Sequence, residues 1–445
     1  MPANLALRTP PLVSGALPGL GHALEFHRDR EGLARRGFEE HGDVFAVQLG
    51  PKRLAMVIGP EHTKTFFAET DRKLDQQAVY GFLRAMFGEV LFLAPPEEYQ
   101  RQRPFMKELL SREKMPRYVE LIEEVVQRWI DGLDDRGEFE VTEVMTHLVQ
   151  QAAAACFLGP EVQARIGEEF WELYEDLSNA LDPLLPPNLP HPKFLRRDRA
   201  KVKLTELLRP IIAERRAHPE QYDDFLQDLV TAEFRDGELV DEERLRNLLV
   251  GLVFASHETT IGQAAWSLIL LLQHEEYLGK VQAELDAEAP HPTPFDLGVL
   301  SRLPHLAWTV KEVERIRPSI DLLMRLVVED IEFGDHVIPE GWLVEVVQVV
   351  SHRLPGLFDR PEAFDPLRFG PGREEDKQHR FSTFGFGGGI HKCPGMTFAN
   401  SEMVIIVALL LRQLDLELLT PDPQVVSTLG ANRASPATVR YRRRT

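Results

Sequence analysis

The stretch FGFGGGIHKCPG, residues 384–395, holds four glycines within five residues, followed by a cysteine. Clustered glycines can leave backbone N–H groups accessible to a phosphate. The spacing here argues against that use. The dinucleotide pattern GxGxxG, counted from Gly385, requires glycine where Ile390 stands, and the P-loop requires Gly-Lys-Ser/Thr where the chain has His391-Lys392-Cys393. Another kind of ligand is therefore expected at this loop.

Cys393 has two interpretations when the loop is considered alone. It is either a buried, inert cysteine in a glycine-rich turn, or a single soft ligand or nucleophile where glycines let the backbone approach a large flat group. The basic residues His391 and Lys392 precede it, and a helix is expected to resume soon after residue 395. Both features favour the thiolate.

The composition of the whole chain narrows the class of protein. The 445 residues are 43% apolar and 27% charged, with a net charge of −19 and only two cysteines. This balance is typical of a globular protein, excludes a disulfide framework and opposes binding to nucleic acid or anionic lipid. Residues 1–26 contain no run of about 18 apolar residues, so we expect neither a membrane anchor nor a signal peptide, and a cytoplasmic location.

Periodicity predicts a mainly α fold with small β-sheets, in a single domain over residues 1–445. Residues 43–58 alternate around Gly50-Pro51 and predict a hairpin, which places a β-rich part at about 1–60 and a helical body at about 61–445. Proline clusters at 182–192 and 289–295 interrupt the helices. The first separates helices expected at about 161–181 and 196–217, and is either a mobile lid or a rigid connector. A further apolar helix is expected at 401–414.

Residues 241–274 lack proline and predict one long buried helix, of about 50 Å at 1.5 Å per residue. Its centre carries a polar insert at residues 256–260. The zinc-protease motif HExxH starts to match at His257, but its second histidine is replaced by Ile261. The insert therefore needs a different explanation.

The cysteine loop resembles that of a known family. Phe386-x-x-Gly389-x-x-x-Cys393-x-Gly395 matches the haem-binding signature FxxGxxxCxG of the cytochrome P450 family. The resemblance implies that the Cys393 thiolate ligates the iron of haem b, that Gly389 and Gly395 allow close approach to the porphyrin, and that His391 contacts a propionate. It implies the fold of that family, with a long helix across the haem and a cysteine-ligand loop.

Two further motifs agree with the family and imply a structural network. Glu312 and Arg315 form an ExxR pair, which is common on any helix, but the PxRF motif that contains Arg368 follows it in the family's order. By this resemblance Glu312, Arg315 and Arg368 are expected to form one buried network.

Ala255 and the polar insert after it map onto the family pattern (A/G)-G-x-(D/E)-T-(T/S), with Ser256 in place of its glycine. By this resemblance Glu258 and Thr259 are an acid–alcohol pair that relays protons to dioxygen. The structural alternative is a Thr259 hydroxyl that bonds back to a helix carbonyl. His257 is the only obvious polar side chain on this helix that could face the substrate.

Several segments resemble the sterol 14α-demethylase branch, among them Tyr80-x-Phe82-Leu83 and Leu323-Met324-Arg325. This likeness implies that Tyr80, Arg101 and Arg325 join His391 at the propionates. The chain departs from the branch at Glu258, where that branch usually has histidine, and at Ser256, where it usually has glycine. The branch also tends to have an acidic residue where Leu93-Ala94 stands. The likeness is therefore in the scaffold more than in the site.

By the same resemblance, three segments are expected to line an apolar substrate pocket. By sequence alone, each of their side chains is more readily explained as core. They are Phe82, Leu83, Phe87, Phe92, Phe254, Ala255, Ile320, Leu322, Leu323 and Met324.

The expected activity is insertion of one oxygen atom from O2 into a bulky hydrophobic substrate, such as a terpenoid, a sterol-like compound or a specialised metabolite. The alternatives are a sterol 14α-demethylase, a peroxide-driven peroxygenase and a non-catalytic haem sensor or carrier. Because no flavin or nicotinamide fingerprint occurs, electrons must come from a ferredoxin or flavodoxin-type donor with its reductase.

We expect a monomer that docks its electron donor on a basic face of its surface. The candidate cations are Lys392, Lys377, Arg380, Arg103 and Lys107.

Overall fold

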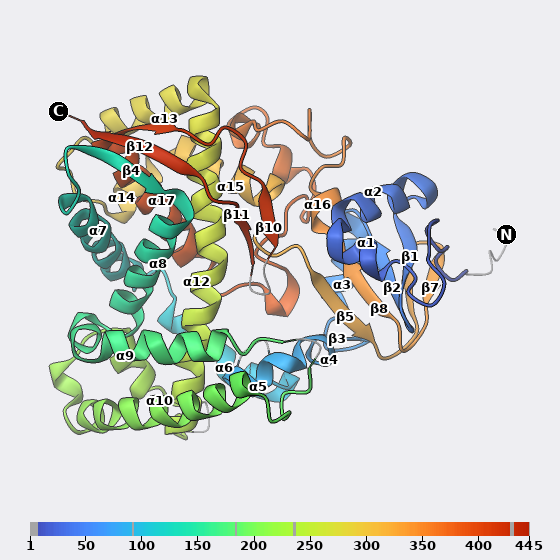
Figure 1. Cartoon of the computed structure of the whole chain (residues 1–445), viewed down its shortest axis with the longest axis horizontal. Helices are drawn as coiled ribbons and strands as arrows, with labels where there is room; N and C mark the ends of the chain where they lie inside the picture. Colours follow the sequence, from blue (N-terminus) through green and yellow to red (C-terminus); the bar gives the residue numbers. More distant parts are fainter. Residues whose placement is uncertain (1–7, 91–92, 183–184, 235–236, 428–430, 445) are drawn as a thin grey trace. The chain divides into compact units, whose positions relative to one another are not determined.

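The structure is a computed structural model that describes residues 8–90, 93–182, 185–234, 237–427 and 431–444 (Figure 1). The chain divides into two compact units. Unit 1 comprises Met1–Val79 and Lys311–Cys393, and unit 2 comprises Tyr80–Val310 and Pro394–Thr445. The predicted fold class, mainly helical with small sheets, is confirmed.

Unit 1 is built on a five-stranded sheet with the order β1-β2-β8-β5-β3. The predicted hairpin is present as an antiparallel pair, and Gly50 at its turn has a φ of 57°, a conformation that favours glycine. Strands from later in the chain complete the sheet, with β8 parallel to β2 and antiparallel to β5. The strands are β1 (Val44–Leu49), β2 (Lys52–Val57), β8 (Leu343–Val346), β5 (Leu323–Val327) and β3 (Leu74–Asp75), and a separate pair is formed by β6 (Ile331–Phe333) and β7 (His336–Ile338).

Both faces of this sheet are buried. Successive residues of a strand point to opposite faces, so Ala55 and Val57 of β2 pack with Phe66 on one side, whereas Leu54 and Met56 pack on the other. The covering helices of unit 1 are α1 (Ala23–Arg28), α2 (Arg30–His41), α3 (Pro60–Ala68) and α16 (Gln348–Ser351).

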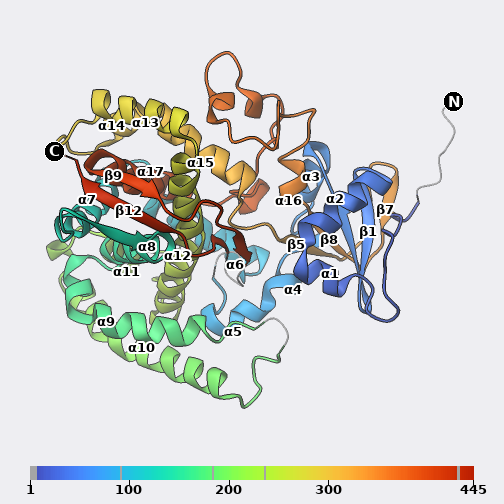
Figure 2. The ribbon, with the colours of Figure 1, turned by 45° about the horizontal axis from the view of Figure 1, so that its top comes forward.

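Unit 2 is mostly helical, and its longest element is α12 (Glu242–Gln273). The Asp241 carboxylate accepts the Arg244 N–H at 2.8 Å and caps the N-terminus of α12, so the predicted 241–274 helix is confirmed. The helix packs on α8, α17 and β11 (Figures 1 and 2). The other helices are α5 (Arg84–Phe87), α6 (Pro96–Leu109), α7 (Met115–Asp131), α8 (Val141–Phe157), α9 (Pro160–Ser178), α10 (Pro192–Ala217), α11 (Phe225–Val230), α13 (Glu275–Glu288), α14 (Leu297–Ser301) and α17 (Met396–Gln413), while α4 (Gln77–Tyr80) and α15 (Pro304–Ile316) contain residues of both units.

Small sheets complete unit 2. One sheet has the order β4-β12-β9, and β10 pairs with β11 in a second. Their bounds are β4 (Arg136–Glu140), β12 (Thr438–Arg443), β9 (Leu414–Leu418), β10 (Val425–Ser427) and β11 (Asn432–Ala434). The pair β10 and β11 places Arg433 beside α12.

The connector between α9 and α10 is tied to the helix that follows it. The two helices lie side by side (Figures 1 and 2). Lys193 pairs with Asp182 at 2.6 Å, and Arg197 donates to the Pro187 carbonyl at 2.9 Å. The helix also starts at Pro192, earlier than residue 196. These contacts favour the rigid-connector alternative over the lid, for the described part of residues 182–192.

Within the described residues, α17 is the one helix whose length and hydropathy would allow it to span a membrane. However, 67% of it is buried inside the protein. Such burial is what a core helix of a soluble protein shows.

The ExxR and PxRF motifs meet in unit 1. Arg315 donates two hydrogen bonds of 2.8 Å to the Glu312 carboxylate, and Arg368 donates a third at 3.1 Å. The side chains of all three residues are fully buried. Arg368 also binds Glu375 at 2.7 Å, and both arginines donate to the Ala363 carbonyl. The network therefore joins α15 to the segment before the cysteine loop.

Candidate active site

The cysteine loop of unit 1 turns back on itself before it reaches Cys393. Gly387 N–H donates to the Phe384 carbonyl at 2.8 Å, and Cys393 N–H donates to the Phe386 carbonyl at 2.9 Å. Cys393 is exposed at the end of this loop, which excludes the alternative of a buried, inert thiol. Phe386 is half-buried.

Two side chains that the sequence analysis did not single out fix the start of this loop. His352 Nε2 accepts the Phe384 N–H at 3.0 Å, and Glu314 accepts the Gly385 N–H at 2.9 Å. Burial lowers the pKa of His352 to about 3, so its ring is neutral and its Nε2 can accept. Burial raises the pKa of Glu314 to about 7. A Cβ on Gly385 would lie 2.4 Å from the Glu314 side chain, which explains the glycine at that position.

Gly389 has a structural reason for being glycine that differs from the expected one. Its φ is 63°, and a Cβ there would lie 2.7 Å from the Phe67 carbonyl oxygen of α3. The close approach in the structure is therefore to protein backbone. Gly395 has a φ of −85° at the start of α17, so its backbone does not require glycine.

The side chains that are expected to bind the haem propionates make contacts with protein groups in the structure. In unit 1, His391 Nε2 lies 2.6 Å from Asp71, and Arg325 is 3% exposed, with its guanidinium over the Phe66 ring at 4.9 Å. Tyr80, at the end of α4, is half-buried.

Arg101 lies on α6 of unit 2. Its guanidinium pairs with Glu238 and lies 3.9 Å from the centroid of the Phe234 ring. These contacts give Arg101 a structural role, and its place at a propionate stays a prediction.

The long helix α12 has one narrow stripe of residues near its middle that other parts of the protein do not fully cover. We call it the open stripe. Between residues 245 and 271, where nearly all positions are buried, Ala255 is exposed and Leu252, Ser256 and Thr259 are half-buried. Their spacing of three and four residues places them on one face. The Thr259 hydroxyl, on this stripe, donates to the Ala255 carbonyl at 2.9 Å, as the structural alternative predicted.

Glu258 lies at the edge of this stripe, with a different partner for each of its oxygens. Its Oε2 accepts from Arg433 of β11 at 2.5 Å, and its Oε1 lies 3.4 Å from His257 Nδ1. Burial raises the pKa of Glu258, but His257 and Arg433 outweigh burial, so this pKa lies below its ordinary value. His257 is 6% exposed and lies off the stripe, against α9. It is thus not the polar group on the open face that the sequence suggested.

The expected pocket residues fall into two sets. Phe87, Phe254 and Leu83 are buried, and the Phe87 and Phe254 rings lie 4.8 Å apart in unit 2. The other set, which is apolar yet not fully buried, consists of Phe82 and Ala255 in unit 2 and Ile320, Leu322, Leu323 and Met324 in unit 1. Phe92 lies outside the described residues.

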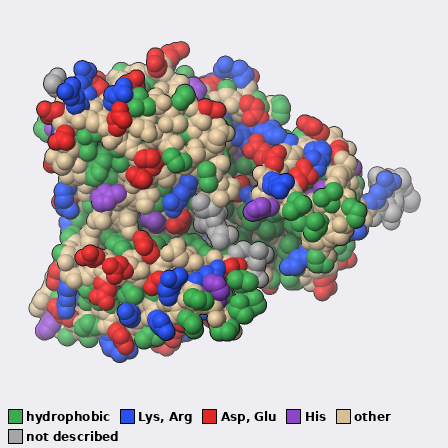
Figure 3. Space-filling view, viewed as in Figure 1, with side chains coloured by type: hydrophobic (Ala, Val, Ile, Leu, Met, Phe, Trp, Pro, Cys, Tyr) green, Lys and Arg blue, Asp and Glu red, His purple; other side chains and the backbone are tan. Residues whose placement is uncertain are grey.

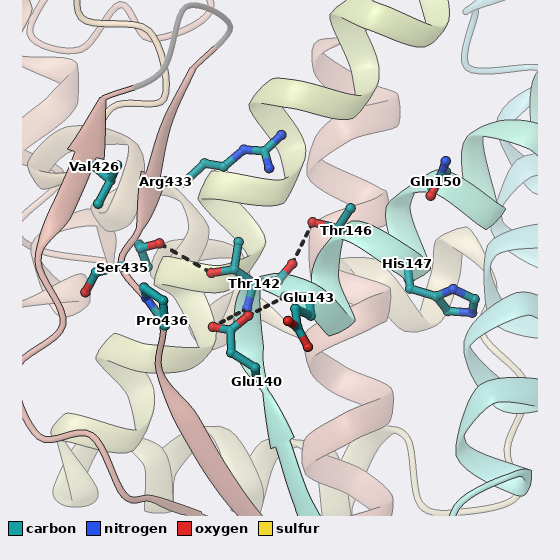
Figure 4. Close-up of a pocket in the computed structure, with 11 residues that line it drawn as sticks. Glu140, Thr142, Glu143, Thr146, His147, Gln150, Val426, Arg433, Ser435 and Pro436 are labelled. Atoms are coloured by element: carbon teal, nitrogen blue, oxygen red, sulfur yellow. Dashed lines mark hydrogen bonds between the residues drawn. The ribbon is translucent and has the colours of Figure 1, made fainter. Parts of the chain in front are cut away.

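A separate open pocket of ≈ 530 Å³ lies in unit 2 between the start of α8 and the β10–β11 pair (Figure 4). It is lined by polar side chains, among them Glu143, His147 and Arg433. Figure 4 shows Arg433 extending from β11 toward α12, where it reaches Glu258. The pocket therefore gives solvent access to the cationic partner of Glu258.

The metal-ligating side chains of the site suit a metal ion whose other ligands come from a bound cofactor. Among the described residues there is no group of three or more His, Cys, Asp or Glu side chains able to hold a metal ion. The loop offers one exposed thiol, with the exposed, apolar Ile390 close to it in sequence. A single thiolate beside an apolar surface suits iron held in a porphyrin.

Comparison with known proteins identifies the family. The family model described as Cytochrome P450 matches residues 10–435. A protein named sterol 14alpha-demethylase from Mycolicibacterium vanbaalenii is 33% identical over 99% of both chains, and one named sterol 14-demethylase from Arabidopsis thaliana is 32% identical over 98% of this chain and 92% of that one. The solved structure entitled "Retinoic acid bound cyanobacterial CYP120A1" has a TM-score of 0.84 at 25% identity, over 98% of this chain and 100% of that one.

The chain belongs to the cytochrome P450 family. It is a P450 monooxygenase whose cofactor is haem b, and it uses O2, a hydrophobic substrate and redox partners. These parts of the sequence-based prediction are confirmed.

Proposed function

We propose that this enzyme inserts one oxygen atom from O2 into a bulky hydrophobic substrate, a terpenoid, a sterol-like compound or a specialised metabolite. The observation that carries the proposal is the open stripe on α12, where the exposed Ala255 and the relay alcohol Thr259 share one face beside Glu258. An apolar surface binds by the area it removes from water, at about 25 cal/mol per Å², so large apolar molecules gain most.

Bound haem supplies the activation of O2, with Cys393 as its thiolate ligand and His391 and Arg325 as cations for its propionates. Each turnover converts RH, O2, two electrons and two protons into ROH and water. Glu258 and Thr259 pass those protons, from the carboxyl to the hydroxyl and then to oxygen. Phe386, Gly389 and Gly395 shape the cysteine loop, and Tyr80 and Arg101 stay candidates for the propionates.

Sterol 14α-demethylation is the second candidate. Relatives with that name align over nearly the whole chain, which supports it. Glu258 and Ser256 stand where that branch usually has histidine and glycine, which is why the broader substrate class is preferred.

The intact Glu258–Thr259 pair argues against a peroxide-driven enzyme, and a non-catalytic haem sensor or carrier would need no relay.

Thr259→Ala tests the relay directly. With a surrogate ferredoxin and its reductase, and without added substrate, reduction of O2 to water consumes two NADPH and reduction to peroxide consumes one. Because the variant lacks the hydroxyl that delivers protons, the NADPH-to-O2 ratio should fall toward one, while the spectrum of the bound haem is unchanged. Glu258→Gln should act in the same direction. An unchanged ratio in both variants would refute the relay.

Lanosterol, retinoic acid and palmitate are suitable probes of the substrate class. Displacement of the iron's water ligand is read as a shift of the haem absorption band, and we expect micromolar binding of a sterol or terpenoid. Phe82→Ala should weaken this binding, because the half-buried Phe82 ring is available to a ligand.

Phe87→Ala, at a fully buried ring, is the matched comparison. It should lower the free energy of unfolding by about 3–5 kcal/mol, as large-to-small core substitutions do. A preference for small charged metabolites would contradict the proposed substrate class.

We further propose that the electron donor is a ferredoxin or flavodoxin-type protein that docks on a basic surface of unit 1. Lys392 and Arg380 are exposed there, whereas Lys377 is exposed but pairs with Glu374. Arg103 and Lys107, the other candidates, lie on α6 of unit 2. Figure 3 shows basic and acidic side chains interspersed over the face in view, so any attraction must be local.

The rate of reduction by an acidic ferredoxin should fall as ionic strength rises from 0.01 to 0.15 M, because the Debye length falls from about 30 to about 8 Å over this range. Lys392→Glu should reduce the low-salt rate and weaken its salt dependence, whereas Lys203→Glu on α10 should not. A reduction rate that does not change with salt would contradict the basic docking surface.

We also propose that the enzyme is a monomer in the cytoplasm.

A further inference from the structure

The two oxygens of Glu258 differ in what their neighbours can do. Arg433, at Oε2, stays protonated at any physiological pH and cannot release a proton. The solvent-accessible pocket beside Arg433 therefore does not supply protons through that residue. His257, at Oε1, is the neighbour that can both take and give a proton.

His257 lies in a triangle of three rings on α9 and α12. Its ring centroid lies 6.0 Å from those of Trp171 and Tyr174, which are 5.3 Å from each other. His257 is 6% exposed and Tyr174 is 4% exposed. We call these three side chains the aromatic triangle.

The aromatic triangle contains buried polar atoms that the protein itself does not satisfy. Among the described residues, His257 Nε2, Trp171 Nε1 and the Tyr174 hydroxyl are buried and have no hydrogen-bond partner. Buried polar atoms of this kind are rarely left unpaired and commonly bind internal water. Internal water is the partner that would satisfy these three side chains.

We propose that the aromatic triangle binds internal water and that His257 shuttles protons from this water to Glu258, which makes His257 a positioning and relay residue for the reaction. This rests on the relay of the proposed function and adds its proton source. Water gives a proton to His257 Nε2, the Nδ1–H proton passes to Glu258 Oε1, and the carboxyl then supplies Thr259. The water is reprotonated from solvent, so no further reactant is needed.

His257→Phe and Tyr174→Phe test the shuttle in the haem-loaded enzyme. We expect His257→Phe to slow the formation of water from O2 by about 10²-fold, the lower end for a positioned proton donor, and to lower the NADPH-to-O2 ratio. Tyr174→Phe should cause a smaller loss in the same direction. Tyr118→Phe is the matched control, because that hydroxyl is buried elsewhere in unit 2 and donates to the Leu109 carbonyl.

Thermal unfolding of the same proteins gives a readout that is independent of turnover. If the triangle is hydrated, Tyr174→Phe removes a satisfied hydroxyl and should lower Tm, as Tyr118→Phe should. If the triangle is dry, Tyr174→Phe removes an unsatisfied polar atom and should raise Tm. A crystal structure with ordered solvent should show water bound to Tyr174 and His257.

The outcomes separate the shuttle from the relay. A raised Tm in Tyr174→Phe, or an unchanged NADPH-to-O2 ratio in His257→Phe while Thr259→Ala lowers it, overturns the shuttle and leaves the relay standing. Unchanged ratios in Thr259→Ala and Glu258→Gln overturn both.

Discussion

Cys393→His should abolish oxygen activation while the protein still folds. An imidazole nitrogen can bind haem iron, but it lacks the electron donation by which a thiolate favours cleavage of the O–O bond. We therefore expect the variant to take up haem, to lose NADPH-dependent O2 reduction, and to lose the long-wavelength band of the reduced carbon monoxide complex. Haem content, NADPH oxidation and that spectrum measure the three effects.

Cys156→Ser is the control, because the other cysteine of the chain is 1% exposed within α8. Burial raises the pKa of Cys156, so it is a neutral thiol and unsuited to metal binding. The variant should keep both the band and the activity. Retention of both in Cys393→His would rule out the assignment of the ligand.

Arg368→Leu should strongly lower the free energy of unfolding. The change leaves the Glu312 and Glu375 carboxylates buried without one of their cationic partners, and breaking a buried ion pair costs about 3–5 kcal/mol. A domain is stable by only about 5–15 kcal/mol. We expect little soluble, haem-loaded protein, and a lower denaturant midpoint for what remains.

Arg373→Leu is the matched control for this network. Arg373 also pairs with Glu375, but its side chain is 33% exposed, so its loss should cost no more than about 1 kcal/mol. Equal denaturant midpoints for the two variants would show that the buried network does not stabilise the fold.

The features that the sequence predicted well are local ones. The hairpin at 43–58 and the helix at 241–274 follow from patterns that a few consecutive residues carry, and the structure has both. The cysteine loop was likewise found from its spacing. The sheet order of unit 1 was not predicted, because β8 and β5 join the N-terminal hairpin from almost 300 residues away.

The contacts that position the site were missed for a related reason. His352 and Glu314 hold the loop from 32 and 71 residues away in sequence, and Arg433 reaches Glu258 across 175 residues. No local pattern marks such pairs. Glu314 does begin an ExxR spacing with Arg317, but this spacing gives no indication that its carboxylate holds the loop.

Two residues have protein contacts that the resemblance did not indicate. The positive φ of Gly389 and its close approach to the Phe67 backbone require glycine there, whatever its role toward a porphyrin. The Arg101 guanidinium pairs with Glu238 and lies over the Phe234 ring. The roles of both residues toward haem stay predictions.

The spectrum of the reduced wild-type enzyme with carbon monoxide tests whether the exposed Cys393 thiol, at the end of its anchored loop, is the thiolate ligand of haem b. We predict the long-wavelength absorption band after which the family is named, with one haem per chain. A haem-loaded, correctly folded protein that shows only the shorter-wavelength band of histidine-ligated haem would contradict it.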